Sequence, residues 1–361
     1  MNEATAKQYV QQDFGPLDAL LKDPDVMEIM VNSYQQIFIE KRGQLIEVQN
    51  SFRDEDHLLE IIQNIARPLG RKLDDSNPIL DLRLPDSSRV HIVGRPIALA
   101  GPTMNIRKFP RQSLTTDDLI GFGSWNDTIV DFIRACVLAR LNILVIGGTG
   151  SGKTTVQNLV AQMIPDEERI VTVEHTNELR LTKKHLVALE GRPPNLEGQG
   201  EVTMKQLVDA ATKMRPDRIV AGEVHGGEVY PLVLAMNRGN DGMIFSMYAT
   251  SVRDALIRLE IMMNEGNPAV PLLAVREQLA TALDVIVCQQ RLRDGGRRVV
   301  SVTEVVGLEG GMMKTQDIFE FRQTGFENGK IEGYFTATGT LPTFFDLLQD
   351  IPEAMFTPTS G

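Results

Sequence analysis

The pattern of apolar and polar positions divides the chain into two parts with different periods. In the first part, Phe14–Lys22 and Asp54–Leu69 carry apolar residues at the spacing of an amphipathic helix. Shorter apolar runs between turn residues predict strands at Leu80–Leu84, Val90–Val93 and Thr103–Arg107, a further apolar run at Val26–Val31, and a hairpin formed by Gln36–Glu40 and Gln44–Val48. We therefore expect a small α/β domain over residues 1–110, followed by a polar linker over residues 111–124.

From Trp125 onward, short apolar runs alternate with longer amphipathic segments. Strands are predicted at Asn142–Ile146, Ile170–Val173, Arg218–Ala221 and Met243–Ser246. Helices are predicted at Asp127–Arg140, Thr154–Met163, Met204–Met214, Gly227–Asn237 and Val252–Met263. This alternation is typical of βαβ units, so residues 125–361 are expected to form an α/β domain around a mainly parallel sheet. Val299–Val306 and the segments near the C-terminus are expected to be edge strands and connecting turns.

The composition agrees with a globular protein of two domains. A chain of 361 residues is long enough for two cores, and its hydrophobic and charged fractions are ordinary. No apolar run approaches the roughly 20 residues of a membrane-spanning helix, and Met1–Gln12 is too polar for a secretory signal, so a cytoplasmic location is expected. A net charge of −11 argues against broad attraction to nucleic acid. Cys136 and Cys288 lie in apolar surroundings and are expected to be buried thiols.

One segment carries a complete chemical motif. The phosphate-loop pattern G-x-x-x-x-G-K-[ST] directly follows an apolar strand and falls on Gly147, Gly152, Lys153 and Thr154. Glycines let successive backbone N–H groups point at phosphate oxygens, Lys153 reaches the β- and γ-phosphates, and the Thr154 hydroxyl is placed to ligand Mg²⁺. A glycine-rich turn can also join a strand to a helix without a ligand, but a full-length pattern favours binding of ATP or GTP. The expected binding residues are Gly147, Gly148, Thr149, Gly150, Ser151, Gly152, Lys153, Thr154 and Thr155.

Two glutamates follow neighbouring strands of the expected sheet. Glu174 ends the strand at Ile170–Val173, and Glu223 follows the strand at Arg218–Ala221. Ligands of parallel α/β sheets bind beyond the carboxyl ends of the strands, so both acids are candidates to hold Mg²⁺ and to activate water. A strand-end acid can also be an ordinary solvated residue. Arg107 and Arg89, in the first domain, have no obvious acidic partner in sequence and would, on sequence alone, be solvated surface residues.

Several longer segments carry a resemblance to a known family. They are Leu20–Leu45, Leu84–Val93 and Gly101–Phe109 in the first domain, and the phosphate loop, Gly191–Val202, Met214–Gly227 and Thr250–Glu260 in the second. Together they resemble the ATPases of the type II and type IV secretion superfamily, and are most similar to the tight-adherence (Tad) pilus branch that includes the CpaF motors. The run Met214–Gly227 (MRPDRIVAGEVHGG) is specific to this family. The resemblance implies an α/β fold with a RecA-like P-loop core and a smaller, PAS-like N-terminal domain.

The resemblance also implies roles for single residues. Gly222-Glu223 matches the Walker B element, and Glu174 matches the first acid of the aspartate box and becomes the leading catalytic carboxylate. Arg107 and Arg89 match arginines that the N-terminal domain brings to the nucleotide phosphates. The expected catalytic residues are Lys153, Glu174, Glu223, Arg107 and Arg89. The expected Mg²⁺ ligands are Thr154, Glu174 and Glu223, and ATP is the expected substrate.

Other parts of this family pattern concern assembly and location. The resemblance implies a homohexamer at the inner face of the cell membrane that contacts the membrane only through inner-membrane platform proteins. No DNA-reading element is recognisable in the sequence, so recognition of a specific nucleic-acid sequence is not expected.

The chain departs from the family pattern close to the expected site. His175 stands where the aspartate box has Asp, and His225 stands where Arg usually follows the Walker B element. The two histidines of the histidine box are replaced by Asn240 and Tyr248, and tyrosine cannot shuttle protons near neutral pH because its pKa is about 10. The tetracysteine zinc module of the type II branch is also absent from the sequence.

Three functions follow from these observations. The first is an ATP-hydrolysing motor that assembles, or also retracts, a Tad-like type IV pilus or drives a secretion system. The second is a divergent, weakly active or inactive nucleotide-binding subunit that regulates a related secretion ATPase. The changes in the aspartate and histidine boxes favour this second function. The third, translocation of DNA, gains little support from the acidic composition.

Overall fold

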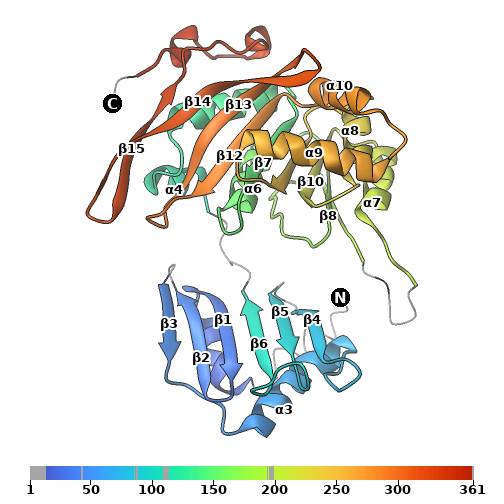
Figure 1. The fold of residues 1–361 in the computed structure, drawn as a ribbon, viewed down its shortest axis with the longest axis vertical. Helices are drawn as coiled ribbons and strands as arrows, with labels where there is room; N and C mark the ends of the chain where they lie inside the picture. The colour runs from blue at the N-terminus through green and yellow to red at the C-terminus, as the bar shows by residue number, and fades with distance from the viewer. Residues whose placement is uncertain are drawn as a thin grey trace. The chain divides into compact units, whose positions relative to one another are not determined.

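The computed structural model describes residues 14–41, 44–84, 86, 88–108, 114–192, 194 and 199–359. The chain forms two compact units, Met1–Ser113 and Leu114–Gly361, which are described separately below (Figure 1). Part of the expected linker differs from the sequence prediction, because Thr116–Gly121 form helix α4. Thr115 starts this helix with a capping box, in which its side chain accepts from Asp118 N and Asp118 accepts from Thr115 N. Residues 111–113 of that linker lie outside the described residues.

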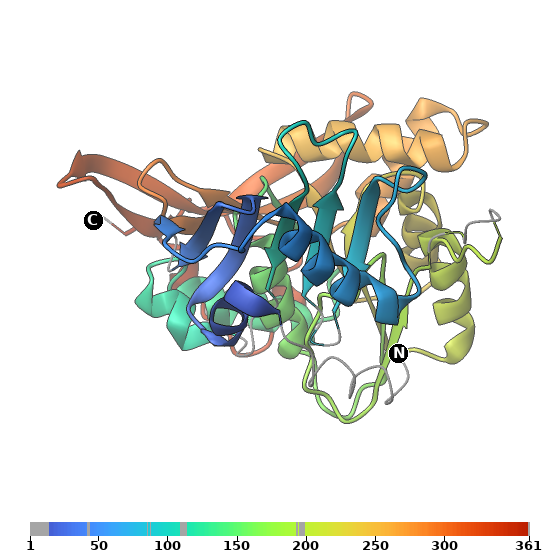
Figure 2. The same ribbon diagram turned by 90° about the horizontal axis from the view of Figure 1, so that it is seen from below.

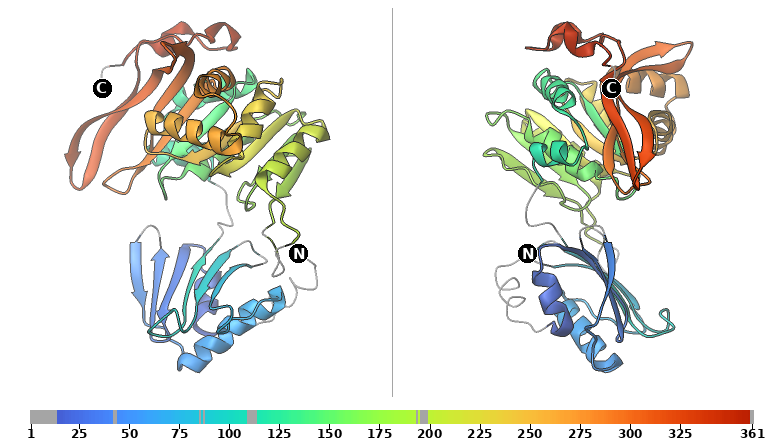
Figure 3. Two further views of the ribbon diagram at one scale, coloured as in Figure 1. Left: turned by 45° about the vertical axis from the view of Figure 1, so that its right-hand side comes forward. Right: turned by 90° about the vertical axis from the view of Figure 1, so that its left-hand side faces the viewer.

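The first unit is built on an antiparallel sheet with the strand order β3-β2-β1-β6-β5-β4. Its strands are β1 (Val26–Ser33), β2 (Gln36–Lys41), β3 (Gln44–Val48), β4 (Ile79–Arg83), β5 (Arg89–Val93) and β6 (Thr103–Arg107). Helices α2 (Asp18–Lys22) and α3 (Glu55–Ala66) lie on one face of this sheet, as Figures 2 and 3 show. The apolar side of α3 packs on that face, so this unit has a core of its own, as the periodicity of Asp54–Leu69 predicts.

The second unit contains a nine-stranded sheet with the order β15-β14-β13-β12-β7-β11-β10-β8-β9. The strands are β7 (Ile143–Gly147), β8 (Ile170–Glu174), β9 (Leu186–Glu190), β10 (Arg218–Val224), β11 (Ile244–Tyr248), β12 (Val285–Arg291), β13 (Arg297–Glu309), β14 (Met312–Glu327) and β15 (Lys330–Ala337). Strands from β12 to β9 in this order pair in parallel, whereas β12 to β15 pair antiparallel. All residues of β7 and β8 are buried, which explains their continuous apolar sequences.

Helices cover both faces of the large sheet. Besides α4 they are α5 (Asp127–Leu138), α6 (Lys153–Gln162), α7 (Met204–Ala211), α8 (Val229–Met236), α9 (Val252–Gly266) and α10 (Leu272–Ala282). One apolar core lies between the sheet and α7, α8, α9 and α10, and a second lies between the opposite face and α5 and α6. Elements β9, α10 and β12 are not predicted by the sequence pattern. The other parallel strands and their helices are found where the alternation of apolar runs and amphipathic segments predicts them.

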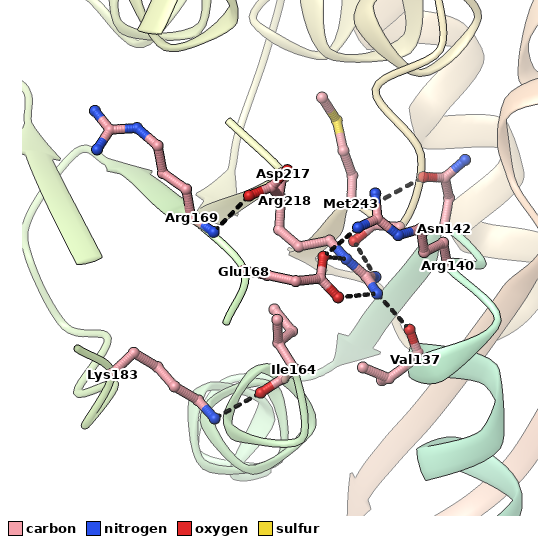
Figure 4. A network of polar contacts seen from close by, with 11 residues as sticks. Val137, Arg140, Asn142, Ile164, Glu168, Arg169, Lys183, Asp217, Arg218 and Met243 are labelled. Atoms are coloured by element: carbon pink, nitrogen blue, oxygen red, sulfur yellow. Dashed lines mark hydrogen bonds and ion pairs between the residues drawn. The ribbon is translucent and has the colours of Figure 1, made fainter. Parts of the chain in front are cut away.

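A buried arginine at the start of β10 joins several elements of this unit (Figure 4). Arg218, the first residue of β10, is 1% exposed and donates to both carboxylate oxygens of Glu168 at 2.8 and 3.2 Å. Two further N–H groups of this side chain donate to Val137 O and Gly242 O. Gly242 has φ +72°, and a side chain there would also collide with this guanidinium, so glycine is required. The network therefore fixes the start of the strand that carries Glu223.

Replacing Arg218 by alanine is expected to lower the free energy of unfolding of this unit by about 3 kcal/mol or more, because buried partners lose their donors. Trp125, the only tryptophan in the sequence, is buried in the same unit, so its fluorescence during denaturant unfolding measures the effect. Arg140→Ala is the control: Arg140 contacts the same Glu168 at 2.8 Å, but its side chain is 46% exposed, so a loss under about 1 kcal/mol is expected. Equal losses in the two variants would contradict the assigned role of Arg218.

Candidate nucleotide-binding site

The phosphate loop connects the end of β7 to the start of α6. Gly150 and Gly152 have φ values of +71° and +93°, a region that favours glycine. A side chain on Gly147 would collide with the carbonyl oxygen of Gln289 and the hydroxyl of Ser151. The glycines that define the motif therefore serve a tightly curled loop, which leads into the N-terminus of a ten-residue helix. Such a loop and helix terminus together favour an anionic ligand.

Lys153, the first residue of α6, is held against an acid. Its side chain is 9% exposed, and its Nζ lies 3.2 Å from Oε2 of Glu223 on β10. A buried ammonium group is costly without an opposite charge, so this ion pair compensates the charge of Lys153. The structure thus brings together two of the predicted catalytic residues.

Glu174, the last residue of β8, lies buried with 2% exposure. Its Oε1 accepts hydrogen bonds from the backbone N–H groups of Glu178 and Leu179 at 2.8 and 2.9 Å. Its Oε2 is buried and has no hydrogen-bond partner among the residues that the structure describes. Burial disfavours the charged form and raises the pKa of Glu174 to about 7, against the two hydrogen bonds that lower it. A carboxyl group with this pKa can accept a proton at neutral pH.

Glu174 and Glu223 lie at the same edge of the sheet because their strands pair in parallel. Val173 is opposite Ala221, so Gly222 comes next to Glu174. A methyl group on Gly222 would lie 3.0 Å from Cγ of Glu174, which explains why glycine precedes Glu223. From α6, the Gln157 side chain donates to Ala221 O at 2.5 Å and ties the helix of the phosphate loop to the strand of the acids.

This residue set fits magnesium and a nucleotide. The curled glycine backbone offers N–H groups to phosphate oxygens, and Oε2 of Glu174 is a hard oxygen atom without a hydrogen-bond partner among the described residues. Mg²⁺ in phosphate sites uses oxygen ligands, commonly one or two carboxylates together with substrate phosphates. Thr154, Glu174 and Glu223 would hold it, and the ion would neutralise charge on the phosphates.

The two predicted arginines belong to the first unit and lie side by side there. Arg89 on β5 is directly opposite Arg107 on β6, and Arg83 on β4 is opposite Arg89, so the three form a row across the sheet. Arg89 and Arg107 are both exposed. Their contact with nucleotide phosphates stays a prediction.

The replaced family positions have local partners of their own. The rings of His175 and His225 have centroids 5.4 Å apart, and Nε2 of His175 lies 3.3 Å from Oε1 of Glu228, which also accepts from His225 N. The contacts of these three residues connect the segment that follows β8 with the segment that follows β10.

At the histidine-box positions, Asn240 donates to Ala235 O in the turn after α8, and the Tyr248 ring lies 5.1 Å from the Arg258 guanidinium. Asn240 is therefore a turn residue in this chain.

Sequence reasoning missed three residues beside the phosphate loop. Gln289 and Arg291 end β12, which pairs with β7, and Arg297 begins β13. The Nε of Arg297 donates to Gly150 O at 2.9 Å. A signal was present, because an apolar run that ends in Gln-Gln-Arg is a buried strand whose polar end lies at the same sheet edge as the motif.

Comparison with known proteins gives a consistent result. Residues 10–339 match the family described as type II/IV secretion system protein. The type IV secretion system protein PtlH of Bordetella pertussis is 34% identical over 337 residues, covering 84% of this chain and 97% of PtlH. The conjugal transfer protein TrbB of Rhizobium radiobacter is 30% identical over 294 residues, covering 80% of this chain and 86% of TrbB.

Two solved structures share the fold. The pilus retraction motor PilT with bound ADP has a TM-score of 0.55 at 19% identity, covering 77% of this chain and 78% of PilT. The ATPase DotB of Legionella pneumophila has a TM-score of 0.55 at 17% identity, covering 80% of this chain and 78% of DotB. They confirm the expected fold class, an α/β chain with a RecA-like core and a smaller N-terminal sheet domain. With the family match over most of its length, this chain belongs to the type II/IV secretion system protein family.

Proposed function

We propose that this protein binds Mg²⁺·ATP at the phosphate loop and hydrolyses it to ADP and phosphate. The observation that carries the proposal is the convergence of Lys153, Glu223 and Glu174 at one sheet edge beside a curled glycine loop. Phosphoryl transfer depends mainly on positioning and on charge stabilisation, and these residues supply a cation, two acids and backbone donors.

Each group has a distinct role in this proposal. The loop backbone and Lys153 hold the phosphates, and Glu223 takes part in holding Mg²⁺. Glu174, whose pKa of about 7 leaves it able to accept a proton, orients and deprotonates the attacking water. Arg107 and Arg89 from the first unit neutralise charge on the transferring phosphoryl group.

Membership of the secretion protein family supports a motor role for this chemistry. We infer that the chain works as a homohexamer at the inner face of the cell membrane, where it acts on inner-membrane platform proteins. Two matched relatives are named as a type IV secretion protein and a conjugal transfer protein, which supports a place in such a machine. The specific machine proposed is a Tad-like pilus, because the family segments of the sequence, taken together, are most similar to that branch. Deletion of the gene should abolish surface pili, and normal piliation of the deletion strain would contradict this assignment.

The proposal is tested by hydrolysis assays on the purified chain. ATP turnover should require Mg²⁺ and should fall to background in Lys153→Ala and Glu223→Gln. If the wild-type chain binds ATP but hydrolyses it no faster than these variants, the chain is a nucleotide-binding subunit without motor activity. The observation that favours this second function is the cluster of His175, His225 and Glu228, in which the two histidines stand where the family pattern has Asp and Arg.

Arg107→Ala is expected to leave ATP affinity within about twofold of wild type and to lower turnover at least about tenfold, because an arginine that meets the phosphates on domain closure acts mainly in the transition state. The measurements are equilibrium binding of a fluorescent ATP analogue and steady-state phosphate release. Arg71→Ala, an exposed arginine of the same unit, is the matched control and should change neither quantity. Unchanged turnover in Arg107→Ala would remove this residue from the site.

A further inference from the structure

The two strands that carry the candidate acids stop pairing with each other just before those acids. The backbone pairing of β8 with β10 ends at Val173 and Ala221. Glu174 and Glu223 lie past this last pair, where Glu174 is paired with a residue of β9 and Glu223 with a residue of β11. The two acids are therefore held by different neighbouring strands, so their relative position depends on side-chain contacts as well as on the ladder.

Glu228 provides such a contact between the two segments. Its Oε1 accepts a hydrogen bond from the backbone N–H of His225 at 2.6 Å, and Nε2 of His175 lies 3.3 Å from the same oxygen. An ionised carboxylate only accepts hydrogen bonds, so Nε2 of His175 is the donor. The side chain of Glu228 is only 12% exposed, which shields both hydrogen bonds from much of the competition with water. One carboxylate oxygen thus connects the residue after Glu174 with the segment after β10.

The two histidine rings add a second contact between the same segments. Their centroids are 5.4 Å apart and their planes are inclined at 31°, which is within the range of favourable ring contacts. His175 directly follows Glu174, and His225 lies two residues after Glu223. The two positions at which this chain has histidine in place of the Asp and Arg of the family pattern are therefore in contact. We infer that they form one joint change rather than two separate losses.

Resting on the proposed function, we propose that His175, His225 and Glu228 form a positioning unit that fixes Glu174 relative to Glu223. Glu174 has to meet the attacking water while Glu223 takes part in holding Mg²⁺, and a displacement of about 1 Å in such an arrangement can cost about 100-fold in rate. The unit acts through the two acids, whereas ATP affinity depends on Lys153 and the phosphate loop. Its loss should therefore lower turnover and leave nucleotide binding intact.

The test separates turnover from binding in variants of His175. Steady-state phosphate release gives kcat and KM, and competition of ATP against a fluorescent analogue gives the ATP affinity. His175→Ala should lower kcat about tenfold and keep the ATP affinity within about twofold of wild type. His175→Gln retains an N–H donor toward Glu228 and should recover most of the turnover. His185→Ala removes an exposed histidine from the segment before β9 and is the matched control, with kcat and ATP affinity unchanged.

A double-mutant cycle shows whether His175 and Glu228 act together. Because they share one hydrogen bond, the variant with alanine at both positions should lower kcat no more than Glu228→Ala alone. Two contacts that act independently would instead multiply their effects. The unfolding transition of His175→Ala, followed by Trp125 fluorescence, should coincide with that of the wild type, because 46% of the His175 side chain is exposed.

Three results decide the proposal. A lower kcat with retained ATP affinity in His175→Ala, together with recovery in His175→Gln, supports it. A kcat of His175→Ala equal to that of His185→Ala, or effects that multiply in the double variant, overturns it. A wild-type chain that binds ATP without hydrolysing it would overturn the proposed function and this proposal with it, which is a different result from an active wild type and a normal His175 variant.

Discussion

Alanine at position 153 is expected to weaken the binding of Mg²⁺·ATP by at least about 100-fold, since loss of a charge-assisted contact with a buried ligand charge costs roughly 3 kcal/mol or more. The side chain is almost buried at the start of α6, and among the described residues no other lysine makes an ion pair with Glu223. Isothermal titration of ATP into the wild-type and variant chains measures the change.

The fold of the variant should remain intact, which separates a binding defect from unfolding. Alanine has the highest helix propensity, and Glu223, with 29% of its side chain exposed, can be hydrated after it loses Lys153. The unfolding transition followed by Trp125 fluorescence should therefore shift little. Lys205→Ala, an exposed lysine on α7, is the control and should bind ATP normally. Normal ATP affinity in Lys153→Ala would rule out the phosphate loop as the binding site.

Glutamine at position 174 is expected to lower ATP turnover by about 100-fold or more while ATP binding is retained, because an amide cannot accept the proton of the attacking water. The wild-type value of kcat/KM, which reports the free enzyme, should rise with pH through about 7, where Glu174 loses its proton. Phosphate release measured from pH 5.5 to about 8.5 gives this profile. Glu277→Gln changes an exposed carboxylate on α10 of the same unit and should leave the profile unchanged.

The same substitution should make the nucleotide-free chain more stable at alkaline pH. The folded-state pKa of Glu174 is raised from 4.5 to about 7, so its contribution to stability is present below pH 4.5 and is lost as the pH rises to 7. Above pH 7 glutamine should therefore be more stable than glutamate by roughly 3 kcal/mol, and near pH 4.5 the two should be equal. Denaturant unfolding at pH 5 and pH 8 measures the difference. Equal stability at pH 8 would show that Glu174 is not held in an unfavourable charged state.

The sequence predicted best where one local pattern determines one element. The phosphate loop, the fully apolar β7 and β8, and the periodic α3 and α5 all depend on residues within a single short window. Glu174 and Glu223 were placed at one edge because parallel strands put their carboxyl ends together, and the register of β8 and β10 confirms that placement.

Other features depend on residues that are distant in the sequence. The pairing of Lys153 with Glu223 and the burial that raises the pKa of Glu174 follow from packing, which no local pattern encodes. The sequence pattern did not predict β12 for two reasons. No helix was predicted directly before it, and the strand ends in polar residues. Arg297 lies far from the loop in sequence, and only the β12–β13 hairpin brings it to Gly150.

The ion pair between Lys153 and Glu223 couples two groups that are both proposed to act on the substrate. Among the described residues, Lys153 is the only cation in an ion pair with Glu223. In the proposed function, phosphate oxygens would compete with Glu223 for the Lys153 ammonium group, and Mg²⁺ would compete with Lys153 for the Glu223 carboxylate. Binding of the phosphates and of the metal ion would then favour each other, because each partner frees the group that the other needs.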